Sequence, residues 1–144
     1  MQKVCVTISF DLLHAGHIDH LEKASKLGDV IIIVDPDEFL IEKKGYVLQP
    51  LKSRMRIAQF LKNNISWIED VVVSIDKDGT CAETLRMIKP DILCKGGDRT
   101  PDNMPQNEIE VCKEIGCKIV YGVGKKLYSS SELVRRLYGE RITS

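Results

Sequence analysis

The chain has 144 residues, of which 43% are hydrophobic and 29% are charged, and its 21 basic and 21 acidic residues balance. This composition argues against disorder and predicts a single globular domain over residues 1–144. Without a polybasic run, nucleic acid is not expected as a partner. No apolar stretch reaches the roughly 18 residues that span a bilayer, so no membrane association is expected. The five cysteines form no C-x-x-C pair and no signal-peptide layout is visible, so we expect reduced thiols and a cytoplasmic protein.

The stretch that opens the chain predicts a strand, a tight turn and a helix. Val4–Phe10 is a nearly unbroken apolar and β-branched run, which is typical of a strand buried on both faces. The residues from Ile18 follow helical spacing, and His14-Ala-Gly-His17 lies between the two elements. A helix that begins at such a turn directs unpaired N–H groups and the positive end of its dipole at one point. We therefore expect an anion site, which Gly16 leaves open because it has no Cβ and to which both histidines can add donors.

A metal site is the first alternative, because all three histidines of the chain lie in this stretch at His14, His17 and His20. Their spacing steps round a helix and does not converge on one point. No cysteine lies near enough in sequence to complete a tetrahedral set. We therefore expect no metal ligated by protein side chains here, while an ordinary turn with incidental histidines stays open.

Further apolar runs alternate with helical patterns along the chain. We expect strands at residues 30–34, 71–74, 91–94 and 118–121, and helices at residues 53–63, 80–89, 107–115 and from 130. Strands separated by helices predict an α/β fold, a Rossmann-like doubly wound parallel five-stranded sheet with helices on both faces. Ligands of such folds collect at the carboxyl edge of the strands.

Two charged segments follow the second strand. Asp35-Pro36-Asp37-Glu38 is either a solvated turn or an acidic group at the sheet edge. Lys43 and Lys44 precede Gly45 in a stretch that reads as a mobile loop as far as Pro50. Two such lysines could hold a triphosphate, although a solvated charge run is the usual alternative.

The next helix is expected to begin with Ser53 as its cap, which puts Arg54 in the first turn. An arginine there is unfavourable for the helix dipole, so it has another purpose. Thr80 and Glu83 have the spacing of a capping box for the helix that follows. Gly96 and Gly97, at the end of the fourth strand, permit a sharp turn whose exposed backbone groups could read the edge of a base, although a plain turn is the commoner meaning.

Three serines open the last helix. Ser129 and Glu132 have capping-box spacing, which alone could explain them. A serine triplet at a helix start is also a phosphate cradle, because hydroxyls and N–H groups point the same way. The function assignment depends on one expectation, namely that the first and last helices direct their amino ends at the same triphosphate.

Three quoted stretches carry a family resemblance: FDLLHAGHIDHLEKASKLGD, KPDILCKGGD and NEIEVCKEIGCKIV. The chain resembles the HxGH nucleotidylyltransferase superfamily, which is cytidylyltransferase-like, and looks most similar to ADP-heptose synthase adenylyltransferase domains. It departs from the family pattern at Ile8, where a glycine is usual. It also has Val134 where many members have a basic residue, and the heptose-type members likewise lack a basic residue there.

The resemblance implies transfer of a nucleotidyl group to a sugar or polyol phosphate with release of pyrophosphate. His14, His17 and Lys44 would be catalytic, and Mg²⁺ would bridge the phosphates. The nucleotide-binding residues implied are Ser9, Phe10, Asp11, Gly16, Lys95, Gly97, Asp98, Tyr128, Ser129, Ser130 and Ser131. The acceptor-binding residues implied are Asp37, Lys43 (the reserve for Lys44), Arg54, which contacts phosphate or makes a supporting ion pair, and Lys125.

The segment from Lys95 to Asp98 favours ATP over CTP within this resemblance, and a homodimer is expected. A glycerol-3-phosphate-type cytidylyltransferase and an FMN adenylyltransferase are the alternative enzymes. A catalytically silent nucleotide-binding module is the alternative from another class, with Ile8 as its support. The identity of the acceptor is beyond the sequence.

Overall fold

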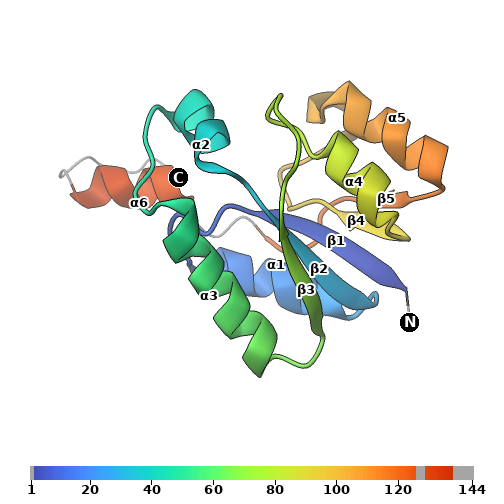
Figure 1. The fold of residues 1–144 in the computed structure, drawn as a ribbon, viewed down its shortest axis with the longest axis horizontal. Coiled ribbons are helices and arrows are strands. Elements are labelled where there is room, and N and C mark those ends of the chain that lie inside the picture. The colour runs from blue at the N-terminus through green and yellow to red at the C-terminus, as the bar shows by residue number, and fades with distance from the viewer. Residues whose placement is uncertain (1, 126–128, 138–144) are drawn as a thin grey trace.

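The computed structural model describes residues 2–125 and 129–137, and in them the chain forms a parallel sheet of five strands. The strands are β1 (Lys3–Ile8), β2 (Asp29–Val34), β3 (Ile68–Val73), β4 (Ile92–Cys94) and β5 (Lys118–Val120). Their order in the sheet is β3-β2-β1-β4-β5, and every neighbouring pair is parallel. This confirms the expected Rossmann-like α/β fold (Figure 1).

Helices cover both faces of the sheet. They are α1 (Ala15–Ser25), α2 (Asp37–Lys44), α3 (Leu51–Asn64), α4 (Ala82–Ile88), α5 (Gln106–Ile115) and α6 (Ser130–Leu137), with a short 3₁₀ helix, η1 (Pro101–Asn103). Figure 1 shows α1 and α3 on one side of the sheet and α4 and α5 on the other. None of the helices described is long and apolar enough to cross a membrane.

The strand pattern explains the two cores. Because successive side chains of a strand point to opposite faces, Val4 and Val6 pack with α1 and α3, whereas Cys5 packs with α4 and α5. All five cysteines are free and buried, so they behave as small hydrophobic residues.

Three local expectations were wrong. The stretch before Gly45 is the helix α2, which ends at Gly45 because that residue adopts the left-handed conformation, with φ of 87°. Helix α3 begins one turn earlier than expected, with Pro50 as its N-cap, so Ser53 lies inside the helix. Helix α4 is capped by Asp76 instead of the Thr80–Glu83 box.

The cap of α4 comes from outside its own first turn. The carboxylate of Asp76 accepts hydrogen bonds from the backbone N–H groups of Glu83, at 2.7 Å, and Thr84, at 3.0 Å. A buried carboxylate on two N–H groups at a helix start satisfies donors that would otherwise be orphaned. A cap from six or more residues upstream leaves no local spacing signal.

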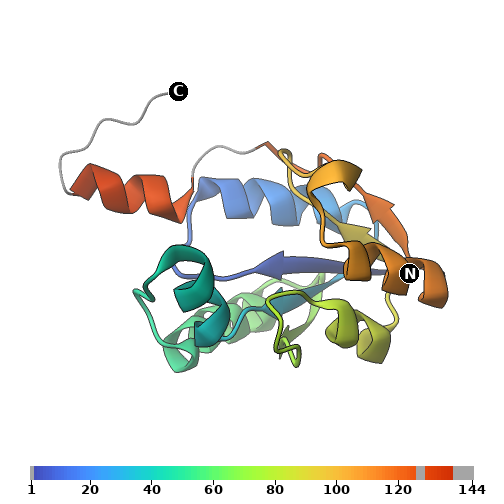
Figure 2. The ribbon, with the colours of Figure 1, turned by 90° about the horizontal axis from the view of Figure 1, so that it is seen from above.

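Helices α2 and α6 lie on the side of the molecule at which α1 begins (Figure 2). That side is the carboxyl edge of the strands, where ligands of doubly wound sheets bind. The fold therefore assembles the histidine turn, α2 and the start of α6 around one edge.

Candidate active site

A cavity of about 680 Å³ opens at the carboxyl edge of the sheet. Its lining comes from the ends of β1, β2 and β4, from the starts of α1 and α6, and from α2 and the segment after β5. The lining residues are Thr7, Ile8, Ser9, His14, Gly16, His17, His20, Asp35, Leu40, Lys43, Lys44, Cys94, Lys95, Gly96, Gly97, Asp98, Arg99, Asn103, Val123, Gly124, Lys125, Ser129 and Ser131.

The histidine turn caps α1 with its own side chains. Nδ1 of His14 accepts a hydrogen bond from the backbone N–H of Gly16, at 3.1 Å. Nδ1 of His17 accepts one from the backbone N–H of His14, at 3.2 Å, and the two rings stack with centroids 3.9 Å apart. The pair forms a capping box in which histidines take the places of serine and glutamate.

This capping fixes the protonation of both rings. Because a backbone N–H can only donate, each Nδ1 is an acceptor without a proton, and the proton of the neutral ring lies on Nε2. Burial lowers the pKa of His14 below its usual value. Burial first, and then repulsion from His14 and His20, lowers the pKa of His17 to about 4. At neutral pH both rings are uncharged, and each carries an Nε2–H donor.

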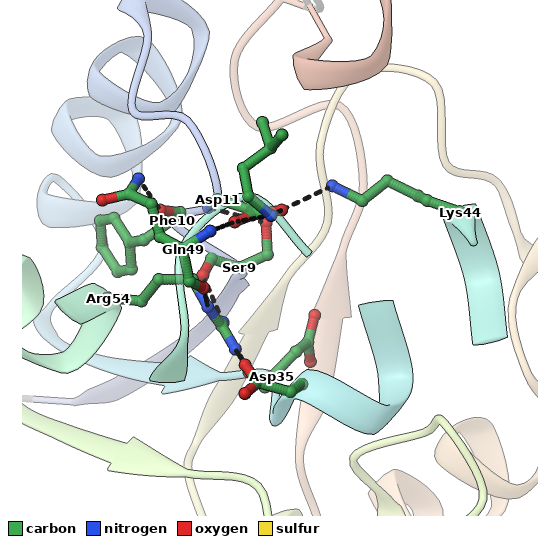
Figure 3. Close-up of polar contacts among 9 residues, drawn as sticks. Ser9, Phe10, Asp11, Asp35, Lys44, Gln49 and Arg54 are labelled. Carbon is green, nitrogen blue, oxygen red and sulfur yellow. Dashed lines mark hydrogen bonds and ion pairs between the residues drawn. The ribbon is translucent and has the colours of Figure 1, made fainter. Parts of the chain in front are cut away.

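Asp11 lies outside the cavity lining, although it was expected to bind the nucleotide. Its side chain is fully buried, and its carboxylate accepts hydrogen bonds from the backbone N–H groups of Leu48 and Gln49, at 2.8–3.1 Å. Lys44 Nζ lies 3.4 Å from the same carboxylate and also lines the cavity. Asp11 therefore anchors the segment after α2 and holds Lys44 at the cavity wall (Figure 3). Phe10 is also fully buried and outside the lining.

Arg54 lies outside the cavity lining, and its side chain is fully buried. Figure 3 shows its polar contacts. Its guanidinium donates to the backbone carbonyls of Ser9, Asp35 and Gln49 at 2.6–2.9 Å. It also forms an ion pair with Asp37, at 2.6 Å. Of the two roles expected for Arg54, phosphate contact and a supporting ion pair, this geometry matches the ion pair. Asp37, its partner, does not line the cavity.

Lys95 lines the cavity but is already paired. Its ammonium lies 3.0 Å from one carboxylate oxygen of Glu108, and both side chains are buried. The second oxygen of Glu108 accepts a hydrogen bond from the backbone N–H of Cys81. The pair ties the end of β4 to α5 and to the start of α4. The neighbouring Gly96 has open space where a Cβ would be.

The segment after β5 is held against α1. Nδ1 of His20 lies 2.5 Å from the carbonyl oxygen of Val123, and the carboxylate of Asp19 accepts a hydrogen bond from the backbone N–H of Lys125 at 2.8 Å. Ser129 then caps α6 through a hydrogen bond from the N–H of Glu132.

Ser129 and Ser131 line the same cavity as His14 and His17, so the amino ends of α1 and α6 border one space. The side chain of Ser130 is not described, and Tyr128 lies outside the described residues. Most of the other expected site residues also line the cavity, namely Ser9, Gly16, Lys43, Lys44, Lys95, Gly97, Asp98 and Lys125.

Sequence reasoning missed several lining residues. His20 had a signal, because it follows His17 by three positions and so lies on the same face of α1. Asp35 was considered only as part of an acidic group. Arg99 and Asn103 lie in the segment of η1, where Arg99 donates to the carbonyl of Asn103 at 2.6 Å. Nothing in their spacing marks them as part of a site.

Among the residues described, no cluster of three or more histidine, cysteine or acidic side chains could hold a metal ion. A divalent cation in this cavity would therefore take its ligands mainly from a bound ligand and water. Mg²⁺ tolerates that arrangement, because it keeps several waters and binds phosphate oxygens with few protein ligands.

Comparisons with known proteins identify the family of this chain. The sequence profile of the cytidylyltransferase-like family matches residues 8–136. The bifunctional protein HldE of Desulfatibacillum aliphaticivorans is 36% identical over 134 residues, which are 92% of this chain and 26% of that protein. The chain spans about a quarter or less of the length of the HldE proteins that it matches.

Two further proteins are similar over nearly their whole length. The FAD synthase of Ferroglobus placidus is 28% identical over 95% of this chain and 88% of that protein. The lipopolysaccharide core biosynthesis protein from Thermoplasma volcanium has a crystal structure with 28% identity and a TM-score of 0.68, covering 90% of this chain and 99% of that one. With the family profile matched from the end of β1 into α6, this chain belongs to the cytidylyltransferase-like family of nucleotidylyltransferases.

Proposed function

We propose that this protein transfers the adenylyl group of ATP to the phosphate of a sugar or polyol phosphate and releases pyrophosphate. The observation that carries the proposal is the shared cavity: the amino ends of α1 and α6 border one space, with two Nε2–H donors at one side and lysines around it. Helix amino ends and fixed donors are suited to a triphosphate.

In the proposed reaction, an oxygen of the acceptor phosphate forms a bond to the α-phosphorus of ATP. The bond from that phosphorus to the bridging oxygen breaks in line, and pyrophosphate leaves with the electron pair. The acceptor phosphate is already ionised, so no side chain has to remove a proton. Positioning and charge neutralisation are then the main contributions of the protein.

The roles follow from the contacts. The Nε2–H groups of His14 and His17 donate to the α-phosphoryl oxygens as charge builds there. Lys44, held by Asp11, and Lys43 and Lys125 supply positive charge for the phosphates. Ser129 and Ser131 add hydroxyls at the start of α6. Mg²⁺, when bound, supplies charge neutralisation on phosphate oxygens.

ATP is preferred over CTP on the resemblance of the Lys95–Asp98 segment to adenylyltransferases. FMN is the second candidate acceptor, because a relative of nearly equal length is named FAD synthase. A glycerol-3-phosphate-type cytidylyltransferase and a silent nucleotide-binding module are the outcomes that the experiment must separate. We also propose that the protein is a homodimer and is located in the cytoplasm.

The test is an acceptor screen with ATP and CTP in parallel, in which the release of pyrophosphate is measured. We expect release with ATP and a sugar 1-phosphate. Release only with CTP and glycerol 3-phosphate would move the protein to the cytidylyltransferase group. Tight ATP binding without release with any acceptor would favour the silent module and overturn the proposal.

A pair of variants tests the role of His17. Asparagine at this position places an amide oxygen near Nδ1 and keeps the cap of α1, but it removes the Nε2–H donor. We expect His17→Asn to lower kcat by about 10²–10³-fold, the usual effect of losing one oxyanion donor, with an unchanged melting temperature. His17→Gln, whose amide reaches the Nε2 position, should retain more activity. Glu22→Gln, an exposed change on the same helix, is the matched control; equal activity of all four proteins would contradict the role.

A further inference from the structure

The cavity lining contains two acidic residues, Asp35 and Asp98, and the phosphate chemistry does not explain the purpose of Asp35. The wall of the cavity is mainly cationic, with Lys43, Lys44, Lys95, Arg99 and Lys125. Asp35, the first residue after β2, nevertheless lines it. A carboxylate in a cavity for a triphosphate weakens the binding of that ligand, unless it serves another part of the bound molecules.

The carboxylate of Asp35 is held by nothing else in the part of the chain that the structure describes. Arg54, its near neighbour, donates to the backbone carbonyl of Asp35 and not to its side chain (Figure 3). Among residues 2–125 and 129–137, no hydrogen bond or ion pair reaches the carboxylate. Burial raises its pKa above the usual value, against the attraction of Lys43, Arg54 and Lys95. A partly desolvated carboxylate of this kind gains from any donor that a ligand brings.

Asp37, the acidic residue expected to contact the acceptor, is unsuited to that task. Its carboxylate is paired with the buried guanidinium of Arg54 at 2.6 Å, and it does not line the cavity. The acidic group after β2 is therefore divided, so that the Asp37 carboxylate holds the framework and Asp35 borders the cavity.

The position of Asp35 assigns it to the acceptor and not to the nucleotide. In a sheet of order β3-β2-β1-β4-β5 the switch point lies between β1 and β4, and nucleotides bind there. Gly96, with open space at its Cα, is on that side. Asp35 follows β2, on the opposite side of β1, and shares that wall with Leu40 and Lys43 of α2. Lys43 has no ion pair within the described residues, so it is available to an acceptor phosphate.

The charges around Asp35 restrict which chemical group of the acceptor can bind to its carboxylate. An ammonium group would meet the attraction of the carboxylate but also the repulsion of Lys43, Arg54 and Lys95. A neutral hydroxyl meets no such repulsion and donates one hydrogen bond. A large flat ring would lack partners too, because no phenylalanine, tyrosine or tryptophan is among the described lining residues.

We infer that Asp35 accepts hydrogen bonds from hydroxyl groups on the carbon skeleton of the acceptor, and that the acceptor is a polyhydroxylated sugar or polyol phosphate instead of an amine-bearing or flavin phosphate. The inference rests on the proposed function. Lys43 binds the phosphate of the same molecule, and Asp35 selects for the hydroxyls beside it.

The experiment compares wild type, Asp35→Asn and Glu38→Gln in pyrophosphate release with ATP. Glu38 is an exposed carboxylate in the first turn of α2 outside the cavity lining, which makes it the matched control. The acceptors are hexose and heptose 1-phosphates, glycerol 3-phosphate, phosphoethanolamine and FMN, and then single-deoxy analogues of the best sugar. Because Asp35 contacts Arg54 through its backbone, Asp35→Asn should fold as wild type does, with a melting temperature no lower than that of wild type.

We expect Asp35→Asn to raise KM for the best acceptor at least tenfold, with KM for ATP and the Mg²⁺ requirement within twofold of wild type. One deoxy analogue should be a poor acceptor for wild type and no worse than the parent sugar for Asp35→Asn. An unchanged acceptor KM, a raised Mg²⁺ requirement, or a preference for phosphoethanolamine or FMN would each overturn the inference and leave nucleotidyl transfer standing. No release by wild type with any acceptor would overturn the proposed function and this inference together.

Discussion

At the scale of single residues, the way in which His14 and His17 cap α1 leaves each ring with one hydrogen-bond donor, at Nε2. Each Nδ1 is used by a backbone N–H, so the only ring proton lies on Nε2. A neutral donor stabilises an oxyanion by a hydrogen bond. It adds no full positive charge, which would also strengthen the binding of an anionic product. In the proposed reaction, the two rings supply direction, while lysines such as Lys44 supply charge.

The depressed pKa of His17 makes stability depend on pH. Its pKa is about 4 in the folded protein and 6.5 in the unfolded chain, so between these values the unfolded state binds the additional proton. We expect the free energy of unfolding to rise as pH increases from about 4 to 6.5 and then to level off, as measured by urea unfolding. The lowered pKa values of His14 and His20 act in the same direction.

Asp35 acts in the opposite direction, because its raised pKa favours the protonated form of the folded protein and stability falls as it ionises. Comparing wild type with His17→Asn therefore isolates the histidine. The variant should show a shallower rise over the same pH range, and an identical slope would contradict the assignment.

Which residues of the site could be predicted depended on whether the signal was local. The turn at His14 and the serines from Ser129 are visible because spacing along a few residues defines them. That Asp37 pairs with the framework while Asp35 faces the cavity depends on Arg54, which lies 17 positions from Asp37. No pattern near the two aspartates carries that information.

At the scale of elements, α2 is a helix that the sequence pattern did not predict. It is short, follows Pro36 and has few apolar residues on one face, so its lysines resembled a loop. In the structure, Lys43 and Lys44 occupy the last turn, where their charges complement the helix dipole, and Gly45 ends the helix. Lys44 is therefore held at the cavity wall by a helix and by Asp11, and is not carried by a mobile segment.

The segment from Gly122 to Lys125 packs against α1 and precedes α6 in the chain. Gly124 has φ of 90°, and a Cβ there would lie 2.9 Å from the Cα of His20. We expect Gly124→Ala to push this segment off α1, move the serines at the start of α6 and raise KM for ATP at least tenfold.

Gly122→Ala is the matched control for Gly124→Ala. Gly122 also has a positive φ, of 68°, but nothing lies within 4 Å of where its Cβ would be. It should lose only about 1 kcal/mol of stability from backbone strain, with KM for ATP unchanged. If both variants raised KM equally, strain and not contact with α1 would be the cause.

At the scale of the whole molecule, the sheet followed from the sequence more fully than the packing did. Unbroken β-branched runs such as Val30–Val34 identify strands buried on both faces, and intervening helices make the sheet parallel. The polar framework beneath the cavity had no such signal. Its centre is Arg54, which joins the carboxyl ends of β1 and β2 to α2 and to the segment before α3.

Removing the Arg54 guanidinium should therefore destabilise the entire fold. Arg54→Met preserves length and apolar volume but leaves three backbone carbonyls and the Asp37 carboxylate without their donor. Leaving three backbone carbonyls without their buried donor, together with the loss of a half-buried ion pair, costs about 3 kcal/mol or more. Arg56→Met removes an exposed arginine from the same helix and should change stability by less than about 0.5 kcal/mol. In urea unfolding we expect a lower midpoint with an unchanged slope for Arg54→Met, because all the connected elements unfold together. A midpoint equal to that of Arg56→Met would mean that the guanidinium does not hold these elements together.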